Sequence, residues 1–392
     1  MDLTFLGDMM RPIYLLCLPI CFLGLSKTGQ TAPCENQSEW PTESWTDATN
    51  QAKEQNADAI AALEEHAFTL QGEDADRIGM RTDGVVIIKG GKLIYEKYAR
   101  GFTKDNPHHT RSVTKSVMSA LTGLAVATNT LTLETSICDY YNNLPPDNCA
   151  ITLQHLLEFS TGLDWVEIYE GQANQVSSVF AMLYGEGRED MGTFVANHPL
   201  RDPPGTTYQY STGDATLLGG ILGKALQEEH GEDFAWDLLF TPLGIQSAVI
   251  ERDLGGQLIG GSYLYATPRD MARFGYFYLQ DGCWENERLL PEDWVTRSTQ
   301  LSPVMSGERI DAAPDWIQGW HWWLNITDPE KGLEAPWPDM PENSFGASGH
   351  WGQSITVLPD YDMVIVRTAD DRDGSFVKND FLKLAVAVGA DL

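Results

Sequence analysis

Residues 112–124 read SVTKSVMSALTGL, with a serine and, three residues later, a lysine at the start of an apolar run. Valine and leucine recur at helical spacing, which predicts a helix beginning at Ser112. Positions three apart share one face of a helix, so the Ser112 hydroxyl and the Lys115 amine come within reach of each other. The helix N-terminus also favours negative charge that develops there. The pattern therefore predicts Ser112 as a nucleophile and Lys115 as its base, provided that the lysine pKa falls from its ordinary value of about 10.4.

The same pattern occurs a second time, at Ser375 and Lys378. A chain of this length contains about one or two such matches by chance, so the motif alone is weak. Ser375 precedes a helix predicted over residues 376–388, where a serine is ordinarily an N-cap. Further segments that carry chemistry follow Ser112 and not Ser375, so the sequence favours Ser112 as the nucleophile.

Two such segments follow Ser112. Residues 204–222, PGTTYQYSTGDATLLGGIL, place Tyr210 in a loop before a predicted helix. A phenol there can relay a proton between a nucleophile and a leaving group, and the alternative is a tyrosine that only packs. Residues 346–360, GASGHWGQSITVLPD, combine small residues with a strand whose N–H groups can approach an oxyanion. The alternative is an ordinary strand after a glycine-rich turn.

The remaining pattern predicts the fold class. Residues 85–99, VVIIKGGKLIYEKYA, form two β-rich runs around Gly90-Gly91, and residues 355–369 form two more around Pro359-Asp360. The segment between these hairpins is mostly helical in pattern. We therefore expect an α/β (α+β) fold, with an antiparallel sheet assembled from both ends of the chain, flanking helices and an inserted helical lobe. The junction of the two parts is a natural cleft.

The N-terminus predicts export. Residues 12–25, PIYLLCLPICFLGL, form an apolar run of 14 residues, which is shorter than the roughly 20 that a membrane span needs. We expect a signal peptide over residues 1–26 and a periplasmic or secreted protein with no stable membrane insertion afterwards. The alternative, a buried N-terminal helix, would have Pro19 in its middle. Residues 27–80 are interpreted as an arm and a helix. Residues 81–392 are interpreted as the main domain, whose α/β part covers 81–111 and about 300–392 and whose helical lobe covers about 116–300.

The net charge and the cysteine positions indicate which partners and which cellular compartment suit this protein. The chain has 56 acidic and 26 basic residues, a net charge of −30, which disfavours nucleic-acid partners and a polybasic membrane anchor. Cys138 and Cys149 bracket a turn-rich loop and are the natural disulfide pair in an oxidising compartment, although two separate buried thiols remain an alternative. The partners of Cys34 and Cys283 are left open. The cysteine spacings match no zinc site.

The ordered set of SxxK, PGTxxxYS and GHxGQ resembles the serine β-lactamase-like superfamily of penicillin-recognising enzymes. The class C-like branch, with its family VIII carboxylesterases, is the most similar, and 6-aminohexanoate-dimer hydrolases share the SVTKS and YST-type motifs. The resemblance implies the β-lactamase/transpeptidase-like fold and a serine hydrolase that requires neither a metal nor an organic cofactor. It implies Ser112 as the nucleophile, Lys115 as its base, Tyr210 as a proton shuttle, and the N–H groups of Ser112 and Gln353 as the oxyanion hole. The substrate-binding residues that it implies are Tyr169, His350, Trp351 and Gly352.

Two departures from this pattern bear on the substrate. Class C β-lactamases carry asparagine and lysine where this chain has Thr212 and His350. A neutral histidine would bind the carboxylate of a β-lactam weakly, so we expect an enzyme acting on a small ester or linear amide. The alternatives are a D,D-peptidase or weak β-lactamase, and a non-catalytic penicillin-binding sensor. Residues 319–326, GWHWWLNI, are interpreted as a strand packed in the core rather than as a wall of the cleft. The oligomeric state is left open.

Overall fold

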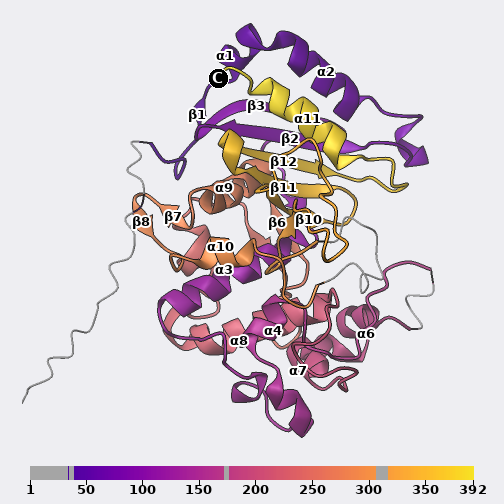
Figure 1. Cartoon of the computed structure of the whole chain (residues 1–392), viewed down its shortest axis with the longest axis vertical. Coiled ribbons are helices and arrows are strands. Elements are labelled where there is room, and N and C mark those ends of the chain that lie inside the picture. The colour runs from indigo at the N-terminus through magenta and orange to yellow at the C-terminus, as the bar shows by residue number, and fades with distance from the viewer. Residues whose placement is uncertain (1–33, 35–38, 172–175, 306–316) are drawn as a thin grey trace, which may run out of the picture. The chain divides into compact units, whose positions relative to one another are not determined.

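A seven-stranded, mostly antiparallel sheet is assembled from both ends of the chain (Figure 1). The computed structural model describes Cys34 and residues 39–171, 176–305 and 317–392, and the predicted signal peptide lies outside these ranges. The strand order is β1-β3-β2-β12-β11-β10-β9, and the β1–β3 pair is parallel. The strands are β1 (Thr46–Asp47), β2 (Thr82–Lys89), β3 (Lys92–Tyr98), β9 (Trp323–Leu324), β10 (Phe345–Gly349), β11 (Gln353–Leu358) and β12 (Met363–Ala369).

Both predicted hairpins are confirmed. β2 and β3 pair antiparallel across Gly90-Gly91, and both glycines adopt the positive φ that the turn requires. β11 and β12 pair across the Pro359 turn. β12 then pairs with β2, so the two hairpins join at the centre of the sheet. This pairing confirms that the sheet is built from both termini.

Helices cover both faces of the sheet. α2 (Ala57–Phe68) and α11 (Lys378–Val388) lie together on one face, and α9 (Pro268–Leu279) packs against β2, β11 and β12 on the other (Figure 1). Val85 and Ile87 of β2 belong to the apolar cluster that contains residues of α2 and α11, whereas Val86 and Ile88 belong to the cluster of α9. Two covered faces explain why β2 is an unbroken apolar run rather than an alternating one.

The helical lobe follows β4. Its helices are α3 (Val113–Ala127), α4 (Leu153–Leu157), α6 (Ser178–Tyr184), α7 (Met191–Ala196) and α8 (Thr212–His230). Smaller elements connect this lobe to the sheet: α1 (Thr49–Gln55), α10 (Trp294–Ser298), β4 (His108–His109), β5 (Val249–Ile250), β6 (Leu264–Ala266), β7 (Cys283–Trp284) and β8 (Glu287–Arg288). α3 packs against α8 within the lobe and against β10 and β11 of the sheet, so the helix that begins after Ser112 lies at the junction.

The predicted cap of the last helix is wrong. α11 begins at Lys378, its N-cap is Val377, and no side chain caps it. Ser375 lies in the preceding loop, where its N–H donates to Asp373 Oδ1 at 3.0 Å. The loop turns at Gly374, which has a positive φ, so the chain enters the helix later than the sequence pattern indicates.

Two disulfides cross-link the described residues. The predicted bond between Cys138 and Cys149 is present, with 5.2 Å between the two Cα atoms. A second bond joins Cys34 to Cys283, 249 residues apart in sequence, and thereby ties the arm to the β7 strand. Across the described ranges, no helix has the length and hydropathy needed to cross a bilayer.

We expect the paired change Cys138→Ser and Cys149→Ser to lower the free energy of unfolding by about 3 kcal/mol. The bond closes a short loop, and the loop-closure entropy that it removes from the unfolded chain corresponds to that magnitude. Urea unfolding followed by tryptophan fluorescence measures the change. An unaltered midpoint would mean that the loop holds its geometry without the bond.

Candidate active site

Ser112 lies at the junction of the helical lobe and the sheet. It is the N-cap of α3, and its side chain makes no capping hydrogen bond to the helix. The preceding residue, Arg111, has a φ of 56°, an uncommon backbone conformation for a side-chain-bearing residue. Ser112 and Arg111 line a cavity of about 760 Å³. The Ser112 hydroxyl is therefore available for chemistry in the cavity rather than for capping.

Lys115 is buried one turn along α3 and has three oxygen neighbours. Its Nζ lies 3.1 Å from Ser112 Oγ, 3.0 Å from Thr212 Oγ1 and 2.6 Å from the Gly261 carbonyl oxygen. The Thr212 hydroxyl donates its own proton to Glu167 at 2.5 Å, so its lone pair can accept from the amine. When Lys115 is neutral, two N–H bonds satisfy Thr212 and Gly261, and the remaining lone pair faces the Ser112 hydroxyl. This is the arrangement that a general base requires.

The pKa of Lys115 supports that role. Burial of the amine lowers the pKa from its ordinary value to about 8, and the negative charge of Glu167 opposes the decrease. A minority of the amine is therefore unprotonated at pH 7 and about half at pH 8.

Tyr210 joins the pair from the loop before α8. Its phenol is hydrogen-bonded to the Ser112 side chain, and its ring centroid lies 4.8 Å from Lys115 Nζ. Burial raises the Tyr210 pKa, so the phenol stays neutral and carries a proton that it can pass on. The structure thus brings together the three residues that the sequence predicts for the reaction.

Glu167 is a site residue that the sequence analysis missed. Its carboxylate accepts from the Thr212 N–H at 2.9 Å and from the Trp165 indole N–H at 2.6 Å, and it also contacts the Tyr169 hydroxyl at 3.0 Å. It thereby orients Thr212, which in turn contacts Lys115. A single glutamate in an irregular loop gives no sequence signal, because its role depends on a contact across 45 residues.

We expect Glu167→Gln to move the rising limb of the pH–rate profile, which reports the deprotonation of Lys115, to lower pH. Loss of the carboxylate charge removes the one Coulombic effect that raises the Lys115 pKa, so the amine deprotonates earlier. The measurement is kcat/KM for an ester as a function of pH. Glu170→Gln is the matched control, because Glu170 also lines the cavity but exerts no resolved effect on Lys115. A limb that stays in place or moves upward would contradict the effect.

Three of the predicted substrate-binding residues line the cavity: Tyr169, His350 and Trp351. The Tyr169 and His350 rings are stacked with centroids 6.0 Å apart, and His350 Nε2 lies 3.5 Å from Glu170. Burial lowers the pKa of His350, although Glu170 opposes the decrease, and the lowered pKa favours the neutral ring. The Trp351 ring contacts two guanidinium groups, those of Arg111 and Arg372.

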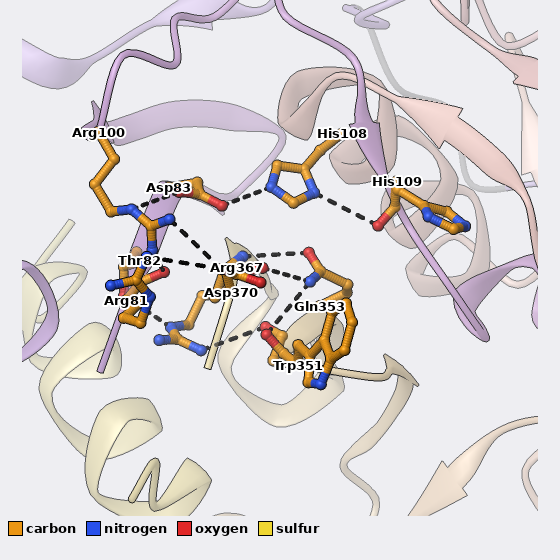
Figure 2. A network of polar contacts seen from close by, with 12 residues as sticks. Arg81, Thr82, Asp83, Arg100, His108, His109, Trp351, Gln353, Arg367 and Asp370 are labelled. Carbon is orange, nitrogen blue, oxygen red and sulfur yellow. Dashed lines mark hydrogen bonds and ion pairs between the residues drawn. The ribbon is translucent and has the colours of Figure 1, made fainter. Parts of the chain in front are cut away.

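Two further predicted site residues do not line the cavity: Gly352, predicted to bind substrate, and Gln353, predicted to supply an oxyanion-hole N–H. Gln353 begins β11 and is 2% exposed, and its side-chain amide donates to the backbone carbonyls of Ala369 at 2.6 Å and Trp351 at 3.3 Å. Gly352 packs against the buried Arg367–Asp371 ion pair. Figure 2 shows Gln353 in the polar network that also contains Trp351 and Arg367. Gly352 therefore lies outside the cavity, unlike the substrate-binding position predicted for it, and the Gln353 side chain is directed toward the sheet interior.

The open edge of β10 offers a different N–H. β10 pairs with β11 along its whole length but with β9 only at its first two residues. The Ser344 carbonyl faces the β9 side, where it accepts from the Asn325 N–H at 3.1 Å. Alternate residues of an antiparallel strand direct their backbone groups to the same side, so the N–H of Ser348 points there too, beyond the end of β9. Because Ser348 lines the cavity, its N–H is the better candidate for the oxyanion hole than that of Gln353.

The tryptophan segment is divided between the core and the site. Trp320 and Trp322 are buried in the core, as predicted. Trp323 lines the cavity instead, and its ring stacks on Tyr210 with centroids 5.9 Å apart. Among the residues with assigned positions, no three His, Cys, Asp or Glu side chains gather as metal ligands would.

Comparison with known proteins identifies the family of this chain. The Beta-lactamase family matches residues 59–388, most of the sequence. The chain therefore belongs to the Beta-lactamase family of serine β-lactamase-like hydrolases, as the motifs predict.

Particular relatives illustrate the range of this family. A 6-aminohexanoate-dimer hydrolase of Paenarthrobacter ureafaciens is 24% identical over 294 residues, which cover 73% of this chain and 72% of that protein. A class C beta-lactamase mutant has a TM-score of 0.58 at 16% identity and covers 88% of this chain and 98% of its own. EstCE1, a hydrolase with promiscuous acyltransferase activity, has a TM-score of 0.60 at 15% identity, with 87% and 100% covered. These structures confirm the fold.

Proposed function

We propose that this chain is a serine hydrolase that cleaves an ester or a linear amide through an acyl-enzyme at Ser112. The observation that supports it best is the convergence of three groups at one cavity. The Lys115 amine lies 3.1 Å from the Ser112 hydroxyl oxygen, and the Tyr210 phenol is hydrogen-bonded to the same side chain. Membership of a hydrolase family agrees with this assignment.

Acylation uses Ser112 as the nucleophile and passes one proton through Lys115 and Tyr210. Ser112 Oγ attacks the substrate carbonyl carbon while its proton passes to the neutral amine of Lys115. The backbone N–H groups of Ser112 and Ser348 stabilise the oxyanion of the tetrahedral intermediate. As the intermediate collapses, the bond to the leaving group breaks, and Tyr210 donates its proton to that group. Lys115 then returns a proton to Tyr210, which restores the neutral phenol.

Deacylation repeats the sequence with water as the nucleophile. The water loses a proton to the Tyr210–Lys115 pair and attacks the acyl carbon. Collapse breaks the bond to Ser112 Oγ, which regains a proton as the acid product leaves. The low pKa of Lys115 matters in both halves of the cycle, because only its neutral form accepts a proton.

The proposal is tested with a fluorophosphonate probe on the folded wild-type protein. We expect one covalent adduct, mapped by mass spectrometry to the peptide that contains Ser112, together with hydrolysis of a p-nitrophenyl ester. A folded protein that forms no adduct and hydrolyses no ester would favour the sensor alternative. A chromogenic cephalosporin serves as the second substrate. Rapid cephalosporin turnover with slow ester turnover would instead favour a β-lactamase or D,D-peptidase.

We also propose that the protein is exported. The two disulfides support this, because such bonds persist in oxidising compartments. Fractionation of expressing cells, with a non-reducing gel to follow both bonds, tests the location. Recovery of reduced protein in the cytoplasmic fraction alone would contradict export.

A further inference from the structure

A second lysine forms part of the wall of the active-site cavity. Lys378 is the first residue of α11, on the sheet face opposite α9. Its side chain passes over Gly346 of β10, where a Cβ atom would lie only 3.2 Å from the lysine Nζ. The absence of a side chain at Gly346 therefore gives the amine its place in the cavity wall.

The Lys378 amine is buried and has no hydrogen-bond partner among the residues that the structure describes. Besides Gly346, the Trp337 ring lies close to the amine, with its centroid 3.9 Å from Nζ. A buried amine without an acceptor is costly, because it loses its hydration and receives nothing in exchange. The same burial lowers the pKa of Lys378 to about 7, with no neighbouring charge contributing.

The charges of the cavity are arranged unevenly. The acidic side chains in its wall are Glu167 and Glu170, which interact with Thr212 and His350 respectively. No ion pair joins an acid to Lys378 in the described ranges. Trp337 covers the Lys378 amine, and Trp323, which is paired with Gly346, also lines the cavity. An anionic group entering the cavity would thus be repelled near Glu170 and attracted near Arg111 and near the protonated form of Lys378.

We propose that Lys378 binds a carboxylate carried by the substrate at a distance from the scissile bond. This inference rests on the proposed hydrolase function and specifies its substrate class as esters or amides with an anionic end. The carboxylate would supply the missing acceptor, the two tryptophans would contact the intervening methylene chain, and the carbonyl would face Ser112. Lys378 would act as a specificity residue and take no part in proton transfer.

Two matched esters test the assignment. Mono-p-nitrophenyl hexanedioate carries a free carboxylate, and its methyl ester is the same molecule without the charge. We expect the wild type to hydrolyse the carboxylate ester with a kcat/KM about tenfold or more above that of the methyl ester, the magnitude of one hydrogen bond to a charged group. In Lys378→Met this ratio should fall about tenfold, and the loss should lie in KM of the carboxylate ester. A wild type that hydrolyses both equally would overturn the proposal.

The control is Lys383→Met, which removes an exposed lysine of the same helix whose partner is Asp339. Lys383→Met should leave unchanged the ratio of kcat/KM for the carboxylate ester to kcat/KM for the methyl ester. Arg111 is the other cation in the cavity wall, so persistence of the preference in Lys378→Met would place the carboxylate elsewhere and overturn the assignment. If Lys378→Met lowers kcat/KM equally for the two esters, Lys378 has a structural role. That result would also overturn the assignment.

A direct binding measurement separates this inference from the proposed function. Titration calorimetry of hexanedioate monomethyl ester into the Ser112→Ala protein requires no turnover. We expect about tenfold weaker binding when Lys378→Met is added, and equal binding would sink the inference. If the wild type hydrolyses neither ester but this difference in binding is found, the hydrolase proposal fails while the carboxylate site stands.

Discussion

Ser112→Ala should reduce turnover of a p-nitrophenyl ester by about 10⁴-fold or more. The change removes the atom that becomes acylated, and neither Lys115 nor Tyr210 can replace it as a nucleophile in the same position. The free energy of unfolding should change by less than about 1.5 kcal/mol, because the hydroxyl makes hydrogen bonds only at the edge of a cavity. Steady-state kinetics and urea unfolding on the same preparation measure both quantities.

Ser375→Ala is the matched control, since it alters the same motif at its second occurrence. Ser375 is exposed in the loop before α11, outside the cavity wall, so turnover should stay within about twofold of the wild type. Equal losses in the two variants would mean that the nucleophile has been assigned to the wrong serine.

Lys115→Met should lower kcat/KM by about 10²- to 10⁴-fold, the usual contribution of a general base. Methionine fills a similar volume in this buried position and cannot accept a proton. The wild-type profile should rise with pH through about 8, because the active amine is the neutral one and its pKa lies there. In Lys115→Met this rise in kcat/KM near pH 8 should disappear.

Lys224→Met provides the comparison for Lys115→Met. Lys224 lies in α8 over the Tyr141 ring, away from the cavity, so both the rate and the limb near pH 8 should be retained. If Lys115→Met kept the same limb with only a lower rate, another group would be the base.

The sequence predicts a feature correctly where the residues that form it are close together along the chain. Gly90-Gly91 predicts its hairpin because a tight turn needs positive φ, and Ser112 with Lys115 predicts a contact because the helix repeat itself brings the two together. Tyr210 required the family resemblance, since nothing local links a loop tyrosine to a helix nearly a hundred residues earlier.

The features that the sequence did not predict depend on tertiary placement. The donor at the strand edge, Ser348 rather than Gln353, follows from which side of β10 is left unpaired, and this depends on where β9 ends. Glu167 acts through Thr212, which is distant in sequence. Lys378 belongs to the motif that was interpreted as a helix cap, and its place in the cavity depends on the bare backbone of Gly346.

The pairing of β2 with β12 has a consequence for how the chain acquires its fold. These strands are separated by more than 270 residues, so the central contact of the sheet waits until nearly the whole polypeptide has left the ribosome. Until then β2 presents an unsatisfied edge that neighbouring molecules could extend, and contacts of such long range form slowly. Deleting the last thirty residues should therefore yield aggregates rather than a smaller active enzyme, and coexpressed chaperones should raise the yield of the intact chain.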